Sequence, residues 1–223
     1  MTKDCYRLLE GYMQSCMNDS AHDREHVYRV LYVALDIAEY ENADRDILIA
    51  ACLLHDIGRK EQNENPSLCH AEVGAEKARR FLSENGFEPG FTDAVCRCIS
   101  AHRFRGDNPP ESIEAKILFD ADKIDVCGTL GIARTLVYNG AHAEPLYSIG
   151  ENGFPSDGSA DPDASFFQEY KYKLERVYSK ILTRRGREIA EERRKTAEAF
   201  YNDMLREVCE PYKKGKALLE KYV

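Results

Sequence analysis

Tryptophan is absent from this chain of 223 residues, and no stretch approaches the roughly 18 consecutive apolar residues that a membrane-spanning helix needs. The N-terminus has no apolar run followed by a small-residue cleavage site, so we expect no secretory signal. Basic residues are in deficit, because 31 lysines and arginines face 39 aspartates and glutamates. The net charge of −8 argues against a general polyanion-binding surface. We therefore expect a cytoplasmic protein with neither membrane binding nor specific nucleic-acid binding.

Eight cysteines do not change this expectation. They are scattered without regular spacing, and Cys52 falls within an apolar helical segment, so we expect most of them to be reduced, buried thiols. Cys96 and Cys98 form a C-x-C pair on an expected helix, where side chains two positions apart point to nearly opposite sides. The pair therefore does not indicate a thiolate zinc site.

Strand-like alternation, internal repeats and low-complexity tracts are also missing, whereas helical periodicity recurs along the chain. We therefore predict an all-α fold, a helical bundle. Residues 46–56 are apolar nearly all round, which predicts a helix at the centre of the core. The expected helices cover residues 26–38, 46–56, 67–85, 92–101, 112–121, 125–138, 166–182 and 187–208.

One segment interrupts the helices. Residues 140–164 contain four glycines and three prolines without a period, which is typical of a long loop. Such loops often act as lids or binding loops, and the alternative is a disordered insertion. We expect one domain, with a helical core at about 21–140, the loop at 140–164 and C-terminal helices at 165–213.

The chemistry of the chain is concentrated in its six histidines. His55 is followed directly by Asp56 at the end of the most apolar helix, where an unpaired carboxylate would be costly. Neighbouring helical side chains diverge by about 100°, but at a helix end both can lean toward one point, and Gly58 frees the backbone for a turn. A divalent cation would stabilise both side chains.

Four segments occur in order on expected helices: HVYRV at 26–30, LLHDIGRK at 53–60, HAEVGAEKA at 70–78 and FDADKID at 119–125. They resemble the HD-domain metal-dependent phosphohydrolases, a family named for its adjacent His-Asp pair. The resemblance covers about residues 21–208. Segments 128–134 and 189–193 are further similar to a bacterial and archaeal subgroup that includes nucleotide pyrophosphohydrolases.

The family pattern implies one divalent metal ion per chain, held by His26, His55, Asp56 and Asp122. Two imidazoles and two carboxylates suit Mn, Mg, Fe, Co or Zn and leave room for water. Asp122 has two acidic neighbours near the end of the same helix. We expect Asp125 to orient a ligand or the water, and Asp120 to be a cap or a salt-bridge partner.

Two later histidines, His70 and His102, are open to two interpretations. In family members with two metals, histidines at matching positions bind the second ion, and in single-metal members they more often face the substrate phosphate. Arg103 stands where a two-metal site would have another histidine, so we expect both rings to act on the phosphate. The basic residues expected to attract the substrate are Arg59, Lys60, Arg103, Arg105 and Lys123. Lys60 and Arg105 are equally consistent with solvated surface cations.

These residues favour a phosphohydrolase acting on a phosphoester or phosphoanhydride bond of a nucleotide-like substrate, for instance converting a nucleoside triphosphate to the monophosphate and pyrophosphate. Positioning and electrostatic stabilisation carry most of such a reaction. The expected catalytic residues are Asp56, Asp125, His70 and His102, and the last three are alternatives for the general acid.

Two other functions remain open. One is a two-metal phosphodiesterase for cyclic nucleotides or dinucleotides. The other is a non-catalytic nucleotide-binding protein, which would be expected to have lost a metal ligand, and none is missing here. The basic segment 184–195 is a weaker candidate for nucleic-acid contact because Glu188, Glu191 and Glu192 interleave with its cations. An oligomer is compatible with each function.

Overall fold

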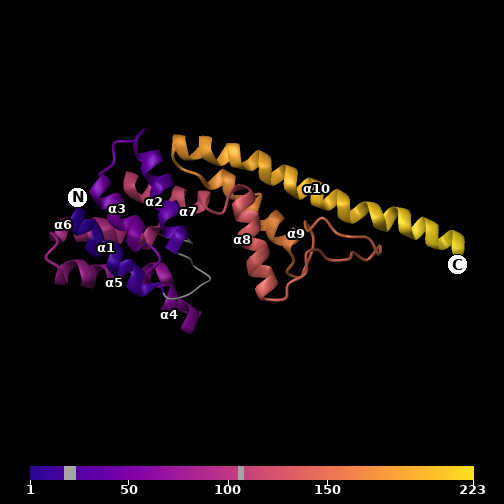
Figure 1. Cartoon of the computed structure of the whole chain (residues 1–223), viewed down its shortest axis with the longest axis horizontal. Helices are drawn as coiled ribbons and strands as arrows, with labels where there is room; N and C mark the ends of the chain where they lie inside the picture. Colours follow the sequence, from indigo (N-terminus) through magenta and orange to yellow (C-terminus); the bar gives the residue numbers. More distant parts are fainter. Residues whose placement is uncertain (18–23, 105–107) are drawn as a thin grey trace. The chain divides into compact units, whose positions relative to one another are not determined.

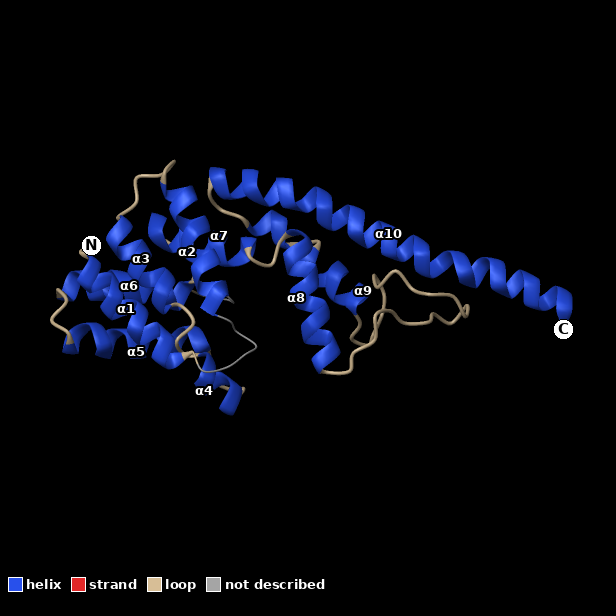
Figure 2. Ribbon diagram, viewed as in Figure 1, coloured by secondary structure: helices blue, strands red, loops and turns tan. Residues whose placement is uncertain are grey.

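The computed structural model describes residues 1–17, 24–104 and 108–223. Every regular element in these ranges is helical, and the paired extended backbone found there is an isolated bridge between Ile149 and Pro155 (Figure 2). The all-α fold predicted from the sequence is confirmed. Among the described helices, none combines the length and apolar character that crossing a membrane requires.

The chain divides into two compact units. The first contains Met1–Asp125 and Leu182–Gly186, and the second contains Val126–Ile181 and Arg187–Val223. The metal ligands expected from the sequence all fall in the first unit. The single domain expected from the sequence stays a prediction.

The first unit is built around α3 (Arg45–Leu54). Asp44 caps this helix, because its side chain accepts hydrogen bonds from the backbone N–H groups of Asp46 and Ile47. The other helices of the unit are α1 (Lys3–Cys16), α2 (Arg24–Ala38), α4 (Arg59–Glu64), α5 (His70–Glu84), α6 (Pro89–Ala101) and α7 (Ile113–Ile124). α3 packs against α1, α2, α5, α6 and α7, so the apolar segment lies at the centre of this unit, as predicted (Figure 1).

Two helices of this unit, α1 and α4, are missing from the sequence-based expectation. In α1, Thr2 supplies the cap, and Leu9 and Met13 are buried four residues apart on one face. That apolar spacing was available in the sequence. α4 has six residues and buries none of them, so no apolar period marks it.

Gly58 explains how α5 comes close to the turn that follows α3. Its φ of −94° is ordinary, so the backbone freedom of glycine, our sequence-based explanation, is not what the turn requires. A Cβ at this position would instead lie 2.3 Å from the backbone oxygen of His70 and 2.7 Å from the backbone nitrogen of Gly74. The missing side chain therefore lets the start of α5 pack directly against the turn.

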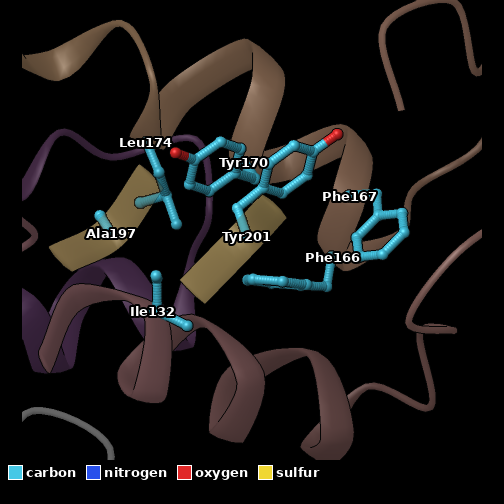
Figure 3. Packing of buried hydrophobic residues seen from close by; sticks show 7 residues of the cluster. All are labelled: Ile132, Phe166, Phe167, Tyr170, Leu174, Ala197 and Tyr201. Atoms are coloured by element: carbon cyan, nitrogen blue, oxygen red, sulfur yellow. The ribbon is translucent and has the colours of Figure 1, made fainter. Parts of the chain in front are cut away.

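The second unit contains α8 (Gly128–Ala141), α9 (Phe166–Glu169) and most of α10 (Arg184–Tyr222). An aromatic cluster holds these helices together, and the rings of Tyr170 and Tyr201 stack with centroids 4.1 Å apart (Figure 3). The buried members of the cluster are Ile132, Phe166, Phe167, Tyr170, Leu174, Ala197 and Tyr201.

Two of the helices expected in this unit differ most from those observed. Residues 166–182 form α9, a π-helical turn at Tyr170–Leu174 and a 3₁₀ turn at Val177–Lys180 rather than one helix. α10 runs to Tyr222 and includes Pro211, although we expected it to end near residue 208. Lys216 explains part of this extension, because its ammonium lies 4.2 Å from the centre of the Phe154 ring in the preceding loop.

That loop, between α8 and α9, is packed on its own unit. The hydroxyl of Tyr201 donates a hydrogen bond to the backbone oxygen of Asp157. Gly158 has a φ of +87°, and a Cβ there would lie 2.3 Å from the backbone of Phe167. The alternative of a disordered insertion is therefore wrong, and a role as a lid stays a prediction.

Candidate metal centre

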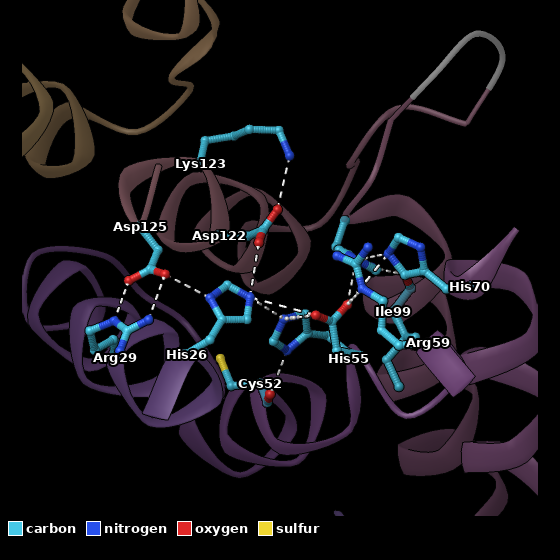
Figure 4. Close-up of polar contacts among 12 residues, drawn as sticks. His26, Arg29, Cys52, His55, Arg59, His70, Ile99, Asp122, Lys123 and Asp125 are labelled. Carbon is cyan, nitrogen blue, oxygen red and sulfur yellow. Dashed lines mark hydrogen bonds and ion pairs between the residues drawn. The ribbon is translucent and has the colours of Figure 1, made fainter. Parts of the chain in front are cut away.

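Three buried side chains converge where α2 begins and α3 ends (Figure 4). His26 lies in the first turn of α2, His55 caps the C-terminus of α3, and Asp56 follows in the turn. The Nε2 atoms of His26 and His55 are 3.4 Å apart, and Asp56 Oδ2 lies 3.6 Å from each of them. The His-Asp pair and the early histidine of the sequence pattern thus meet at one point.

Both imidazoles use Nδ1 for a fixed acceptor. His26 Nδ1 lies 2.7 Å from Asp125 Oδ2, and His55 Nδ1 lies 2.7 Å from the backbone oxygen of Cys52. Because an ionised carboxylate and a carbonyl only accept, each Nδ1 carries the ring proton. In the neutral ring, the Nε2 lone pair therefore points into the shared space beside Asp56.

Asp125 is itself held in place by Arg29. The guanidinium donates from Nε to Asp125 Oδ1 at 2.7 Å and from Nη2 to Oδ2 at 3.1 Å. A carboxylate behind a metal-binding imidazole fixes the tautomer and the orientation of the ring. Arg29 is not among the residues expected from the sequence, although it follows His26 by three residues and so shares its face of α2.

Asp122 reaches this group through His26. Its Oδ1 lies 3.5 Å from His26 Nε2, and its Oδ2 accepts a 2.9 Å hydrogen bond from Lys123 Nζ. It is not part of the group formed by His26, His55 and Asp56, whose ligand atoms all lie within 4.8 Å of one another. Asp122 is therefore the outermost of the four expected ligands.

Asp120, two residues earlier on α7, has different partners from Asp122. It is fully buried and accepts hydrogen bonds from the backbone N–H groups of Leu182 and Thr183 and from the Thr183 hydroxyl, at 2.7–2.8 Å. Asp120 therefore holds the backbone at Leu182 and Thr183 in place, which agrees with the capping alternative expected from the sequence.

The charges at the centre attract a cation. Burial lowers the pKa of His26, but its contacts with Asp122 and Asp125 outweigh this effect and raise the pKa to about 9. Burial raises the pKa of Asp56, but His55, Arg59 and His26 hold it well below its usual range. Burial also lowers the pKa of His55, which keeps this ring neutral near pH 7.

A second group shares Asp56. His70, the first residue of α5, and His102, the C-cap of α6, have their Nε2 atoms 3.3 Å apart. These atoms lie 3.4 and 3.7 Å from Asp56 Oδ1, within a second group that could hold a metal ion. Asp56 therefore stands between two pairs of imidazoles, and each of its oxygens faces one pair.

The tautomers of this second pair bear on its role. His70 Nδ1 lies 2.7 Å from the side-chain oxygen of Gln62, and His102 Nδ1 lies 2.6 Å from the backbone oxygen of Ile99. Burial lowers the pKa of His70 to about 2 and that of His102 to about 4, so both rings are neutral with acceptor Nε2 atoms. This geometry suits a cation better than the phosphate contact expected from the sequence. Gln62 was missed, because no sequence period marks α4.

The expected substrate-binding cations lie at different distances from this centre. Arg59 donates to Asp56 Oδ1 at 2.9 Å, and Lys123 donates to Asp122. Arg103 follows His102 and lies 3.9 Å from the Cys69 sulfur. Lys60 is exposed, with its ammonium 3.9 Å from Glu64 on the same helix, and it makes no described contact with the centre. Arg105 lies outside the described residues.

The first group fits a divalent metal ion. Asp56 Oδ2 is buried and has no hydrogen-bond partner among the described residues, an arrangement that is costly without a compensating charge. Asp56 Oδ2 faces the neutral imidazole of His55 and the imidazole of His26, whose raised pKa indicates that positive charge is favoured at this position. Imidazole and carboxylate donors suit Mn, Fe, Co and Zn, and Mg where carboxylates dominate.

Comparison with known proteins agrees with this geometry. Residues 24–127 match the HD domain, and this span contains the four expected metal ligands and both members of the second histidine pair. The protein YpgQ of Bacillus subtilis, itself uncharacterised, is 32% identical over 191 residues, which cover 83% of this chain and 84% of YpgQ.

Solved structures with the same fold extend over nearly the whole chain. YpgQ in complex with ADP superposes with a TM-score of 0.72 at 28% identity and covers 91% of this chain and 97% of YpgQ. A predicted HD-superfamily hydrolase from an uncultured Thermotogales bacterium has a TM-score of 0.63 at 29% identity, with 90% and 91% covered. An HD-superfamily hydrolase from Bacillus thuringiensis gives 0.71 at 26% identity, with 92% and 97% covered.

Proposed function

The chain belongs to the HD-domain family of metal-dependent hydrolases, and from this premise we propose that it hydrolyses a phosphoester or phosphoanhydride bond of a nucleotide. The observation that carries the proposal is the buried Asp56 Oδ2, which has no hydrogen-bond partner among the described residues and faces the Nε2 atoms of His26 and His55. Support for a nucleotide comes from YpgQ, whose structure contains ADP. One member of the reaction class is conversion of a nucleoside triphosphate to the monophosphate and pyrophosphate.

The metal would be held by His26, His55, Asp56 and Asp122. When bound, a divalent ion lowers the pKa of water and offsets charge on phosphoryl oxygens. Asp125 keeps His26 in the tautomer that binds metal, and Arg29 holds Asp125 in place. Asp125 is therefore proposed as a positioning residue rather than as the general acid.

Two cations at the centre are suited to the substrate. The Arg59 side chain is 26% exposed and that of Lys123 is 22% exposed, so each can pair with an aspartate of the centre and still meet an anion from solvent. Their positive charges also offset the repulsion between a phosphate and the carboxylates of Asp56 and Asp122.

A two-metal phosphodiesterase for cyclic nucleotides or dinucleotides is the second candidate, favoured by the group of Asp56, His70 and His102. Against it, Arg59 already occupies Asp56 Oδ1 at 2.9 Å, and a second ion would have to displace it. The two candidates thus differ in what binds beside His70 and His102.

One experiment separates the candidates. The purified protein, loaded with Mn²⁺, Mg²⁺, Co²⁺ or Zn²⁺, is assayed against nucleoside triphosphates, monophosphates and cyclic nucleotides, with chromatographic separation of products and metal analysis of the same samples. The proposal expects cleavage of a triphosphate or a monophosphate with one ion per chain, and this ion is retained in His70→Ala. Two ions in the native protein, one in His70→Ala and cleavage of cyclic nucleotides would support the second candidate. Absence of hydrolysis of every substrate would contradict both.

A further inference from the structure

A cavity of about 370 Å³ lies beside the second histidine pair. Its walls come from the segment between α4 and α5 and from the residues at and after the end of α6. The residues relevant here are Gln62, Pro66, Leu68, Cys69, Arg103 and Phe104. The volume falls within the roughly 300–1,000 Å³ that small-ligand sites occupy.

Two series of side-chain contacts connect the cavity lining with the metal centre. Gln62 lines the cavity and also accepts the Nδ1–H of His70. Phe104 packs edge-on against Phe119, with centroids 6.4 Å apart, and the ammonium of Lys123 lies 4.9 Å from the centre of the Phe119 ring. Lys123 in turn binds Asp122, so a chain of side-chain contacts connects the cavity lining to the residues expected to hold the phosphates.

Phe104 is an unusual residue for a surface loop. Its side chain is 42% exposed, and its φ of +20° lies in a region that bulky residues rarely adopt. Leu68, on the other segment, is also a large apolar residue that remains 38% exposed. Sparsely populated backbone conformations cluster at ligand sites, and the exposed apolar surfaces of Phe104 and Leu68 are available to a ligand there.

We propose that this cavity binds the nucleoside part of the substrate, with the base stacked on the Phe104 ring. The inference rests on the proposed function, because it assumes a nucleotide whose phosphates reach the metal centre. Every base has a π face, so an aromatic platform accepts a nucleotide without choosing its base by hydrogen bonds. Arg103, which lines the same cavity, supplies a cation toward the phosphate end.

The first test compares affinities in the metal-loaded protein. The ligand is ADP with a methylene bridge between its phosphates, and methylenediphosphonate is the matched ligand without a nucleoside. We expect Phe104→Ala to raise the Kd for the nucleotide about 5- to 150-fold, the range that corresponds to about 1–3 kcal/mol of stacking per base. Phe104→Tyr and the exposed control Tyr222→Ala should leave it nearly unchanged, and no variant should alter the Kd for the diphosphonate.

An equal loss for both ligands, or no loss for the nucleotide, would overturn the assignment. Because Phe104 is 42% exposed and lies outside the buried core, we expect its replacement to leave the fold intact, which circular dichroism checks directly. The same variants give a kinetic check, since loss of stacking should raise KM for a nucleotide much more than it lowers kcat.

The second test uses Cys69 as a reporter of occupancy. In the native, metal-loaded protein, the methylene-bridged nucleotide should slow alkylation of Cys69 by iodoacetamide, as measured by peptide mass spectrometry. Cys209, a half-buried thiol in the second unit, should react at an unchanged rate. Protection of Cys69 without nucleotide hydrolysis would support the cavity and contradict the proposed function. Hydrolysis of nucleotides without protection of Cys69 would contradict the cavity alone.

Discussion

His26 and His55 point their Nε2 atoms at each other across 3.4 Å, while each ring holds its Nδ1 proton for a separate acceptor. Two lone pairs at this distance repel each other unless a positive charge lies between or beside them. In the metal-free protein this charge is a proton on His26, whose pKa is raised to about 9. A divalent ion has to displace that proton, which leads to the first prediction.

We predict that metal affinity falls as pH falls. Below about pH 9 each ion that binds releases one proton from His26, so the apparent Kd should rise about tenfold for each pH unit. Titration of Mn²⁺ into the metal-free protein between pH 6 and 9 measures this slope.

The free energy of unfolding of the metal-free protein should show the opposite trend. The folded-state pKa of His26 lies above its unfolded value of 6.5, so the stabilisation is complete below pH 6.5 and is lost as pH rises through 9.

For the metal-affinity prediction, a Kd for Mn²⁺ that does not change between pH 6 and 9 would show that His26 is not a ligand.

The second prediction concerns Asp125. Asp125→Asn keeps the size of the side chain but weakens its hold on Arg29 and on the Nδ1 proton of His26. Loss of such a supporting carboxylate costs about 10- to 100-fold in metal affinity, and we expect a Kd increase in that range together with a flatter pH dependence. If Asp125→Asn kept the native Kd for metal and the native pH dependence of that Kd, Asp125 would not be a positioning residue.

Two glycines test the contact that brings α5 to the centre. Gly58→Ala would place a methyl group 2.3 Å from the His70 backbone oxygen, and we expect a loss of about 1–3 kcal/mol in stability together with a loss of turnover. Gly90→Ala is the control, because its Cβ would meet no atom within 4 Å and alanine favours helix. Thermal unfolding and activity assays compare the two, and equal behaviour would contradict the packing argument.

Substitutions of two aspartates on α7 should affect different properties, one the stability of the fold and the other metal binding. Asp120→Ala leaves the N–H groups of Leu182 and Thr183 without their acceptor, at a cost of about 1–3 kcal/mol for each group that stays buried. Metal content per folded chain should stay native. Asp122→Ala should do the reverse, with little change in unfolding but reduced metal content and turnover. Loss of metal in Asp120→Ala at a temperature where it is folded would contradict this division.

Local sequence signals were enough to predict part of the fold and part of the site. The apolar character of residues 46–56 placed α3 at the centre of the first unit, and the position of His55 and Asp56 at the end of that helix indicated a metal site, to which the resemblance to the HD-domain family added His26. Helix capping and apolar periodicity are local properties, so one sequence contains them.

Other features depend on contacts between distant segments. The tautomer of His70 follows from Gln62 on another helix, a contact that no sequence spacing predicts. The continuation of α10 past Pro211 accompanies packing of Lys216 on the loop, against a local signal that predicted a helix end. The steric reason for Gly58 likewise depends on where α5 lies.

The central claim is that a divalent ion at His26, His55 and Asp56 is required for hydrolysis, and Asp56→Ala tests it most directly. Metal content by elemental analysis and nucleotide turnover are measured on the same preparations of the native protein, Asp56→Ala and the control Asp4→Ala, whose carboxylate is 95% exposed on α1. We predict that Asp56→Ala loses both the ion and turnover, while Asp4→Ala keeps both. Retention of the ion with unchanged turnover in folded Asp56→Ala would contradict the account.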